Sequence, residues 1–302
     1  MRILAPSYYA DFVCKADKCQ SSCCIGWRVG VDEESLLRFR DMTGKIGEDI
    51  RKSLACDGDG AYITLASDGR CPHLLPSGLC RIISELGQDA VPEICREHPR
   101  FYNMTEHGLE VGLGASCEAA AELIICGADY SALIEVGNAE GDAEAFQYSP
   151  TAERSEVFSL LEKSESFTAA CDALIGRFAP DFCHAELSDF CECFTELEYT
   201  SEMSHRLFTS LGDTKVSRLS LELRNFLAYL VYRHVTPAEN SDDFRARLAF
   251  AILGARAVEA LTVSHGDTRE ALLEFARIFS LEIEYSEDNT DSMIFELSCR
   301  LM

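Results

Sequence analysis

The chain has 302 residues, of which 47% are hydrophobic, and a formal net charge of -24. This length and composition allow one large core or two modest ones and exclude a largely disordered protein. The first residues lack a basic stretch followed by an apolar run, and no apolar run elsewhere approaches the roughly 18 residues of a membrane span. We therefore expect a globular cytoplasmic protein.

The negative charge is unevenly distributed along the chain. Residues 1–107 carry 13 Lys and Arg against 16 Asp and Glu, whereas the other 195 residues carry 14 against 35. Such a field repels phosphate backbones and anionic membranes and attracts cationic partners. It argues against binding to nucleic acid or membrane and suits a lysine-bearing protein substrate, although solubility alone is the simpler explanation.

Short elements are predicted in the first third of the chain. Helix-forming residues predict one or two helices within residues 32–54, broken at Thr43 and Gly44, with Asp32 as N-cap. The segments AYITLA, RFYNM and LEVGL have the β-branched and aromatic content of strands, and the Asp-Gly pairs at 57–58, 59–60 and 68–69 supply turns. These patterns indicate small helices and hairpins around cysteines.

Helical periodicity dominates from Ser116 onward, where Ser116 can cap a helix that ends at Gly127. One apolar helix face in residues 216–235 combines Leu219, Leu223, Phe226, Leu227, Leu230 and His234. We predict a mainly α fold with a small cysteine-rich α+β N-terminal part and a helical C-terminal half. The expected division is a cysteine-rich metal- or cluster-binding domain at 1–127, a linker or loop at 128–150, and a helical domain at 151–302.

Ten of the 15 cysteines fall within the first 126 residues. In a cytoplasmic protein their thiols stay reduced and available to a metal. Four of them, within residues 14–24, are too close along the chain to occupy separate core positions, and clustered thiolates repel one another unless a cation neutralises them. Four more lie in turn-like settings beside Pro, Gly, Arg or Ser. The eight predicted ligands are Cys14, Cys19, Cys23, Cys24, Cys71, Cys80, Cys95 and Cys117.

The spacing leaves the metal open. A four-iron cluster and a structural zinc ion each take four thiolates, so eight candidates allow two sites or one site with free thiols left over. Ordinary buried cysteines are the alternative. His73 and His98 stay outside the set, because a histidine beside proline is more often a turn residue. The group of Cys183, Cys191 and Cys193 fits helix packing better than a second zinc site.

The order of four motifs resembles a known family. ADFVCKADKCQSSCCIGWRVGVD, GRCPHLLPSGLCRI, GQDAVPEICREHPRFYN and LGASCEAAAELI are similar to the N-terminal core of the FliB-type flagellin lysine-N-methylases. The resemblance covers roughly residues 6–126 and continues more faintly into RNFLAYLVYRHVTPAENSDDFRARLAFAIL. The cysteine spacing is also similar to that of CxxxCC-type zinc- or iron-chelating domain proteins.

The resemblance implies methyl transfer from S-adenosylmethionine to lysines of flagellin or a similar surface protein, in an enzyme with a 4Fe-4S cluster. It implies metal ligation by the eight cysteines and cofactor binding by Trp27 and Arg96, and it leaves the catalytic residue unknown. The residues themselves support methyl transfer only weakly, because the glycines in EVGLGAS are not followed by a βα series. The radical-type CxxxCxxC triad is absent, since Gly26 stands at its third position.

Two other functions remain open at this point. A non-catalytic zinc- or iron-binding module could dock a basic partner on its acidic helical half. A cluster-bearing redox protein would instead show a reversible one-electron couple without binding an adenosyl cofactor.

Overall fold

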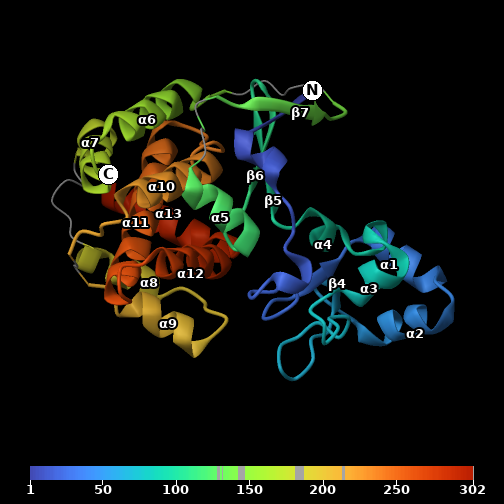
Figure 1. Ribbon diagram of the computed structural model, residues 1–302. Helices are drawn as coiled ribbons and strands as arrows, with labels where there is room; N and C mark the ends of the chain where they lie inside the picture. Colours follow the sequence, from blue (N-terminus) through green and yellow to red (C-terminus); the bar gives the residue numbers. More distant parts are fainter. Residues whose placement is uncertain (128–129, 131, 142–146, 181–186, 213–214, 302) are drawn as a thin grey trace. The chain divides into compact units, whose positions relative to one another are not determined.

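The computed structural model describes the chain except residues 128–129, 131, 142–146, 181–186, 213–214 and 302 (Figure 1). The chain forms two compact units. The cysteine-rich unit consists of Val13–Arg100 and Cys117–Ala119, and the helical unit consists of Met1–Phe12, Phe101–Ser116 and Ala120–Met302. Within the described part of the chain, no helix is both long and apolar enough to cross a membrane.

The cysteine-rich unit combines short helices with a three-stranded antiparallel sheet of order β2-β4-β3. The predicted break at Thr43 and Gly44 separates its two longer helices, and the Asp32 carboxylate caps the first by accepting the Ser35 N–H at 2.8 Å. Its elements are η2 (Ala16–Lys18), β2 (Val29–Val31), α1 (Glu33–Asp41), α2 (Gly44–Ser53), β3 (Leu54–Asp57), β4 (Gly60–Ile63), α3 (Arg81–Leu86), η3 (Gln88–Ala90) and α4 (Glu93–Glu97).

A four-stranded sheet of order β5-β6-β1-β7 belongs to the helical unit, except for Arg100 at the start of β5. Its strands are β1 (Arg2–Ala5), β5 (Arg100–Thr105), β6 (Gly108–Leu113) and β7 (Ile134–Asn138), and η1 (Ser7–Asp11) follows β1. β1 runs parallel to β6, with Ile3 opposite Leu109, and antiparallel to β7. The predicted strands in RFYNM and LEVGL are confirmed as β5 and β6.

Helices make up the rest of the helical unit (Figure 1). They are α5 (Glu118–Cys126), α6 (Thr151–Lys163), α7 (Phe167–Phe178), η5 (Leu187–Phe190), α8 (Cys191–Thr195), α9 (Glu202–Thr209), α10 (Ser220–His234), α11 (Ser241–Ser264), α12 (Arg269–Phe279), the π-helical turn η6 (Ser280–Glu284) and α13 (Glu287–Leu301). The first two residues of α5 belong to the cysteine-rich unit. The predicted fold class, mainly α with a cysteine-rich α+β N-terminal part, is confirmed.

α11 forms the centre of the helix packing and contacts α10, α12 and α13. Apolar side chains cover nearly its whole circumference, as expected of a helix that is enclosed by its neighbours. The apolar face predicted for residues 216–235 is buried in α10 as Leu223, Phe226, Leu227, Leu230 and His234, whereas Leu219 precedes the helix.

The two units divide the chain differently from the expected boundary at residue 127. β1 pairs with strands that lie more than 100 residues further along, because the backbone N–H and C=O groups of a strand need partners. Met1–Phe12 and Phe101–Ser116 therefore join the helical unit. β7 lies within the segment predicted as a linker, and part of that segment is outside the described residues.

The helix predicted to follow Ser116 begins two residues after it, at Glu118, and ends at Cys126. Gly127 follows with a φ of +112°, the left-handed conformation expected of a glycine after a helix.

Candidate functional site

Four of the predicted ligands share one core in the cysteine-rich unit. Cys71 is buried within this core, which includes Val29, Phe39, Ile50 and Ile63, and Cys24, Cys80 and Cys95 pack against it. All eight predicted ligands belong to this unit, and all are free thiols.

Backbone pairing brings the four thiols to this core from distant parts of the sequence. The Cys71 N–H donates to the Cys24 carbonyl at 2.8 Å, next to a bridge between Ile25 and Arg70. A second bridge joins Leu74 to Cys80, so the turn between them returns the chain to the same place. Cys95 comes from α4, which contacts β2.

The four thiols also interact electrostatically. Burial, with neighbouring thiols adding to it, raises the pKa of Cys71 to about 11 and that of Cys95 to about 12, and burial also raises the pKa of Cys80. A hydrogen bond from Cys23 lowers the pKa of Cys24 to about 7. Cys24 is therefore the thiol that ionises most readily, and the others need a cation to become thiolates near neutral pH.

The other four predicted ligands do not join the same core. Cys23 hydrogen-bonds to Cys24, which raises the pKa of Cys23, and it also interacts with Cys95 and Cys14. The exposed Cys14 accepts a hydrogen bond from the Ala16 N–H at 3.4 Å. The eight cysteines are thus divided by the fold.

Cys19 and Cys117 interact near Glu118, at the start of α5. The Cys19 sulfur lies 3.6 Å from a Glu118 carboxylate oxygen, and Lys15 forms a 2.7 Å ion pair with the same carboxylate. Backbone N–H groups of Gln20 and Ser21 donate to it at 2.8 and 3.2 Å. The carboxylate therefore holds the segment that carries Cys19.

The donor set fits a thiolate-held centre by its chemistry, because soft sulfur ligands suit zinc and iron-sulfur clusters. As the side chains are placed, however, no three or more His, Cys, Asp or Glu residues in the described part of the chain form a group that could hold a metal ion. The backbone gathers four thiols on one core without arranging their sulfurs around a single point.

Trp27 and Arg96 flank this region. The Trp27 indole N–H donates to the Cys23 carbonyl, and its ring lies beside the His98 ring with centroids 5.8 Å apart. Trp27 is half-buried, so it is not a full core residue. Arg96 follows Cys95 in α4, and its Nε lies 3.6 Å from Glu97. Their cofactor role stays a prediction.

The two histidines kept out of the ligand set have structural contacts. His73 is buried, and its Nε2 lies 2.9 Å from the Ser53 hydroxyl, while the ring of His98 lies beside that of Trp27 at a tilt of 38°. In the group near residue 190, Cys193 is buried, whereas Cys183 and the side chain of Cys191 lie outside the described residues.

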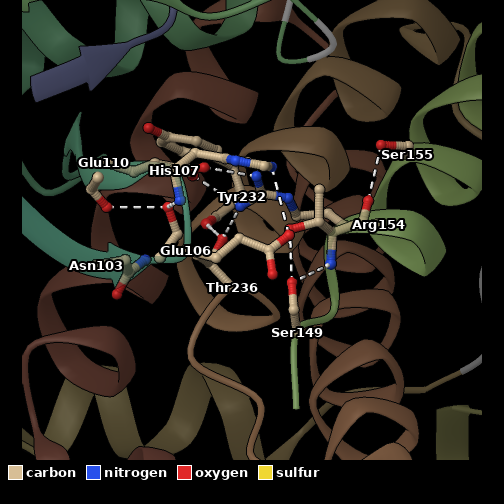
Figure 2. Close-up of polar contacts among 12 residues, drawn as sticks. Asn103, Glu106, His107, Glu110, Ser149, Arg154, Ser155, Tyr232 and Thr236 are labelled. Atoms are coloured by element: carbon tan, nitrogen blue, oxygen red, sulfur yellow. Dashed lines mark hydrogen bonds and ion pairs between the residues drawn. The ribbon is translucent and has the colours of Figure 1, made fainter. Parts of the chain in front are cut away.

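A buried ion pair that the sequence did not predict lies in the helical unit (Figure 2). Arg154 of α6 donates to both carboxylate oxygens of Glu110 in β6, each at 2.7 Å, and also to the Thr236 hydroxyl. Both charged side chains are at most 8% exposed. Two signals were present: an arginine in the first turn of a helix opposes the helix dipole, and a glutamate interrupts an apolar strand.

Arg154 of this ion pair lines a cavity of about 530 Å³. Its lining also includes Asn103, Tyr148 and Glu239. Burial, together with the Glu153 carboxylate, raises the pKa of Tyr148 to about 12. This cavity is large enough for a small-molecule ligand.

The glycines of EVGLGAS are explained by packing. A side chain at Gly112 would place its Cβ 2.3 Å from the Phe101 ring, and one at Gly114 would place it 2.4 Å from the Tyr285 hydroxyl. Both positions lack room for a side chain, so the pattern needs no cofactor loop to account for it.

Fold and site together define a mainly helical protein with a compact cysteine-rich unit, four of whose thiols share one core. In sequence, the chain is distantly similar to two lysine-N-methylases and to a flagellar biosynthetic protein. It is 25% identical over 250 residues to the lysine-N-methylases of Salmonella typhimurium and Salmonella choleraesuis, which covers 76% of this chain and 62% of each relative. It is 27% identical over 142 residues to the flagellar biosynthetic protein FliU of Salmonella muenchen, covering 44% of this chain and 82% of that protein. No family model and no solved structure matches.

Proposed function

We propose that the chain is a protein lysine N-methyltransferase that acts on flagellin or a similar lysine-bearing protein in the cytoplasm. The observation that carries this proposal is the similarity to two lysine-N-methylases over 76% of the chain. Because the alignment spans only 62% of their length, activity and substrate need a direct test.

The methyl donor in this proposal is S-adenosylmethionine, which supplies an electrophilic methyl group when bound. The protein must present the substrate lysine as a free amine, whose lone pair forms the new C–N bond while the S–C pair returns to sulfur. A lysine ammonium has a pKa of about 10.4, so a proton must leave to a base or to water. The net charge of -24 helps to attract such a cationic substrate.

The cysteine-rich unit is proposed to hold a 4Fe-4S cluster through Cys24, Cys71, Cys80 and Cys95, the four thiols that share a core. A cluster or metal would neutralise the thiolates that otherwise repel one another and would add its binding energy to folding. Zinc is the alternative occupant, because it also accepts four thiolates.

The test of activity uses purified protein, flagellin and S-adenosylmethionine. We expect lysine-containing flagellin peptides to gain the mass of one or more methyl groups, and to gain none when the cofactor is omitted. Binding to flagellin without any mass change would favour a non-catalytic module that docks a basic partner.

The test of the metal is analysis of anaerobically purified protein. Iron and acid-labile sulfide in equal amounts are expected. Stoichiometric zinc without iron would contradict the cluster and leave the thiolate site itself intact.

A further inference from the structure

A second cavity, of about 320 Å³, lies in the helical unit beside the π-helical turn η6. The lining residues that matter here are Phe101, Arg233, Arg247, Glu284, Glu287 and Asp291. π-Helical turns are rare and often occur at functional sites. The cavity lining thus includes two arginines and three carboxylates.

The two arginines of the cavity are already paired. Arg233 lies 3.6 Å from the Glu284 carboxylate, and its guanidinium lies over the rings of Phe101 and Tyr285. Arg247 donates to both carboxylate oxygens of Asp243 at 2.9 Å. Neither cation is left to attract an anionic ligand.

The buried carboxylate of Glu284 also has partners within the protein. Glu284 has a fully buried side chain, which His234 contacts at 2.6 Å and the Tyr229 hydroxyl at 3.0 Å. With Arg233 beside it, its negative charge is balanced inside the protein. The Glu284 carboxylate is therefore fully paired within the protein.

The remaining charge of the cavity is negative and unmatched. Glu287 and Asp291 are exposed and lie four residues apart in α13, so they share one helix face. Neither has a hydrogen-bond or ion-pair partner among the residues that the structure describes. A cation that carries an apolar stem would match this lining, because two unpaired carboxylates and the Phe101 ring line the cavity beside the paired Glu284.

We propose that this cavity binds the lysine side chain of the protein substrate. Its aliphatic stem would lie against Phe101 and Pro237 and its ammonium near Glu287 and Asp291. The volume of about 320 Å³ corresponds to about ten water molecules, which is ample for the five heavy atoms of that side chain. This inference rests on the proposed function, because it locates the substrate of that reaction.

The experiment compares two double variants of the whole protein. Glu287→Gln with Asp291→Asn removes the two free carboxylates. Glu270→Gln with Asp288→Asn is the matched control, because it removes two exposed charges from α12 and α13 that do not line the cavity. The probes are a fluorescent peptide with one lysine and the same peptide with norleucine at that position. Peptide binding is measured by fluorescence anisotropy with excess S-adenosylhomocysteine present. Methyl transfer to flagellin is measured on the same protein preparations.

We expect the cavity variant to weaken binding of the lysine peptide about tenfold and the control less than about twofold, because exposed charges that do not line the cavity are screened by solvent and salt. Equal binding of the lysine and norleucine peptides, no binding of the lysine peptide, or an unchanged affinity in the cavity variant would overturn the inference. If the native protein transfers methyl groups but the cavity variant binds the lysine peptide with unchanged affinity, the inference is overturned and the proposed function stands. Lysine-specific binding that needs the two carboxylates, without methyl transfer, would overturn the proposed function alone.

Discussion

The burial and the partners of individual residues in this protein depend on where their neighbours are placed. Cysteines that look alike in the sequence differ in the fold, since Cys71 is buried in a core while Cys14 is exposed. Arg154 and Glu110, which carry no motif, form one of the most enclosed ion pairs of the described chain. Burial and partner geometry, rather than residue type, separate these roles.

Substitution of Cys71 tests which thiols hold the proposed metal. We expect Cys71→Ser to lose bound iron or zinc and to destabilise the cysteine-rich unit, because ligand binding there contributes to folding. Cys56→Ser, at an exposed position in β3, should keep its metal. Metal content per chain, measured by mass spectrometry, decides the matter, and a Cys71→Ser protein with full metal would remove Cys71 from the ligand set.

The buried ion pair predicts a strongly non-additive result. Arg154→Met alone leaves the Glu110 carboxylate buried without its partner and should destabilise the helical unit by about 3–5 kcal/mol. Adding Glu110→Leu removes that charge and should recover much of the loss. Urea unfolding followed by circular dichroism measures both, and a double variant no more stable than Arg154→Met would refute the explanation.

At the scale of elements, the π-helical turn η6 and α10 place charged groups in an apolar interior. Glu284 comes from η6, while Arg233 and His234 come from the last turn of α10. The sequence predicts α10 as an amphipathic helix, and its periodicity correctly places His234 on the buried face. The partner of that histidine lies 50 residues further along, and no local pattern indicates it.

This pairing predicts acid sensitivity. Burial lowers the pKa of His234 below its usual 6.5, and although burial alone raises the pKa of Glu284, Arg233 and His234 hold it below its usual 4.5. Below about pH 6.5 the unfolded chain therefore binds more protons than the folded one, so stability falls as the pH falls, and Glu284 adds to the loss below about pH 4.5.

The measurement is the urea midpoint of the helical unit between about pH 7.5 and about pH 5. We expect the midpoint to decrease across this range in the native chain and to decrease less in His234→Gln, which has no imidazole to protonate. An equally steep decrease in the variant would show that other groups cause it.

At the scale of the whole molecule, an acidic, mainly helical unit accompanies a cysteine-rich unit of nearly balanced charge. The long-range field of such a protein favours encounter with cationic partners and weakens as salt screens it. Electrostatic complementarity of this kind affects association more than the chemical step.

Salt dependence follows from this charge. For the proposed methyl transfer, we expect the KM for flagellin to rise several-fold between about 50 and about 500 mM NaCl, with a smaller change in kcat. Initial rates of methyl incorporation at several flagellin concentrations give both constants. A KM that is independent of salt would mean that the acidic surface serves solubility alone.

Local sequence determined several of the elements of this protein, although β7 lies in a segment predicted as a linker. The Asp32 cap, the break at Thr43 and Gly44, the strands in RFYNM and LEVGL and the buried face of α10 all follow from interactions within a few residues, which composition and periodicity report. The clustering of cysteines in the first third of the chain likewise indicates a thiol-rich unit. What only the tertiary structure decided is which distant groups meet: β1 with β6, Arg154 with Glu110, and Cys24 with Cys71, Cys80 and Cys95. Such contacts depend on chain reversals and on packing between segments far apart in the sequence, and no local pattern encodes them.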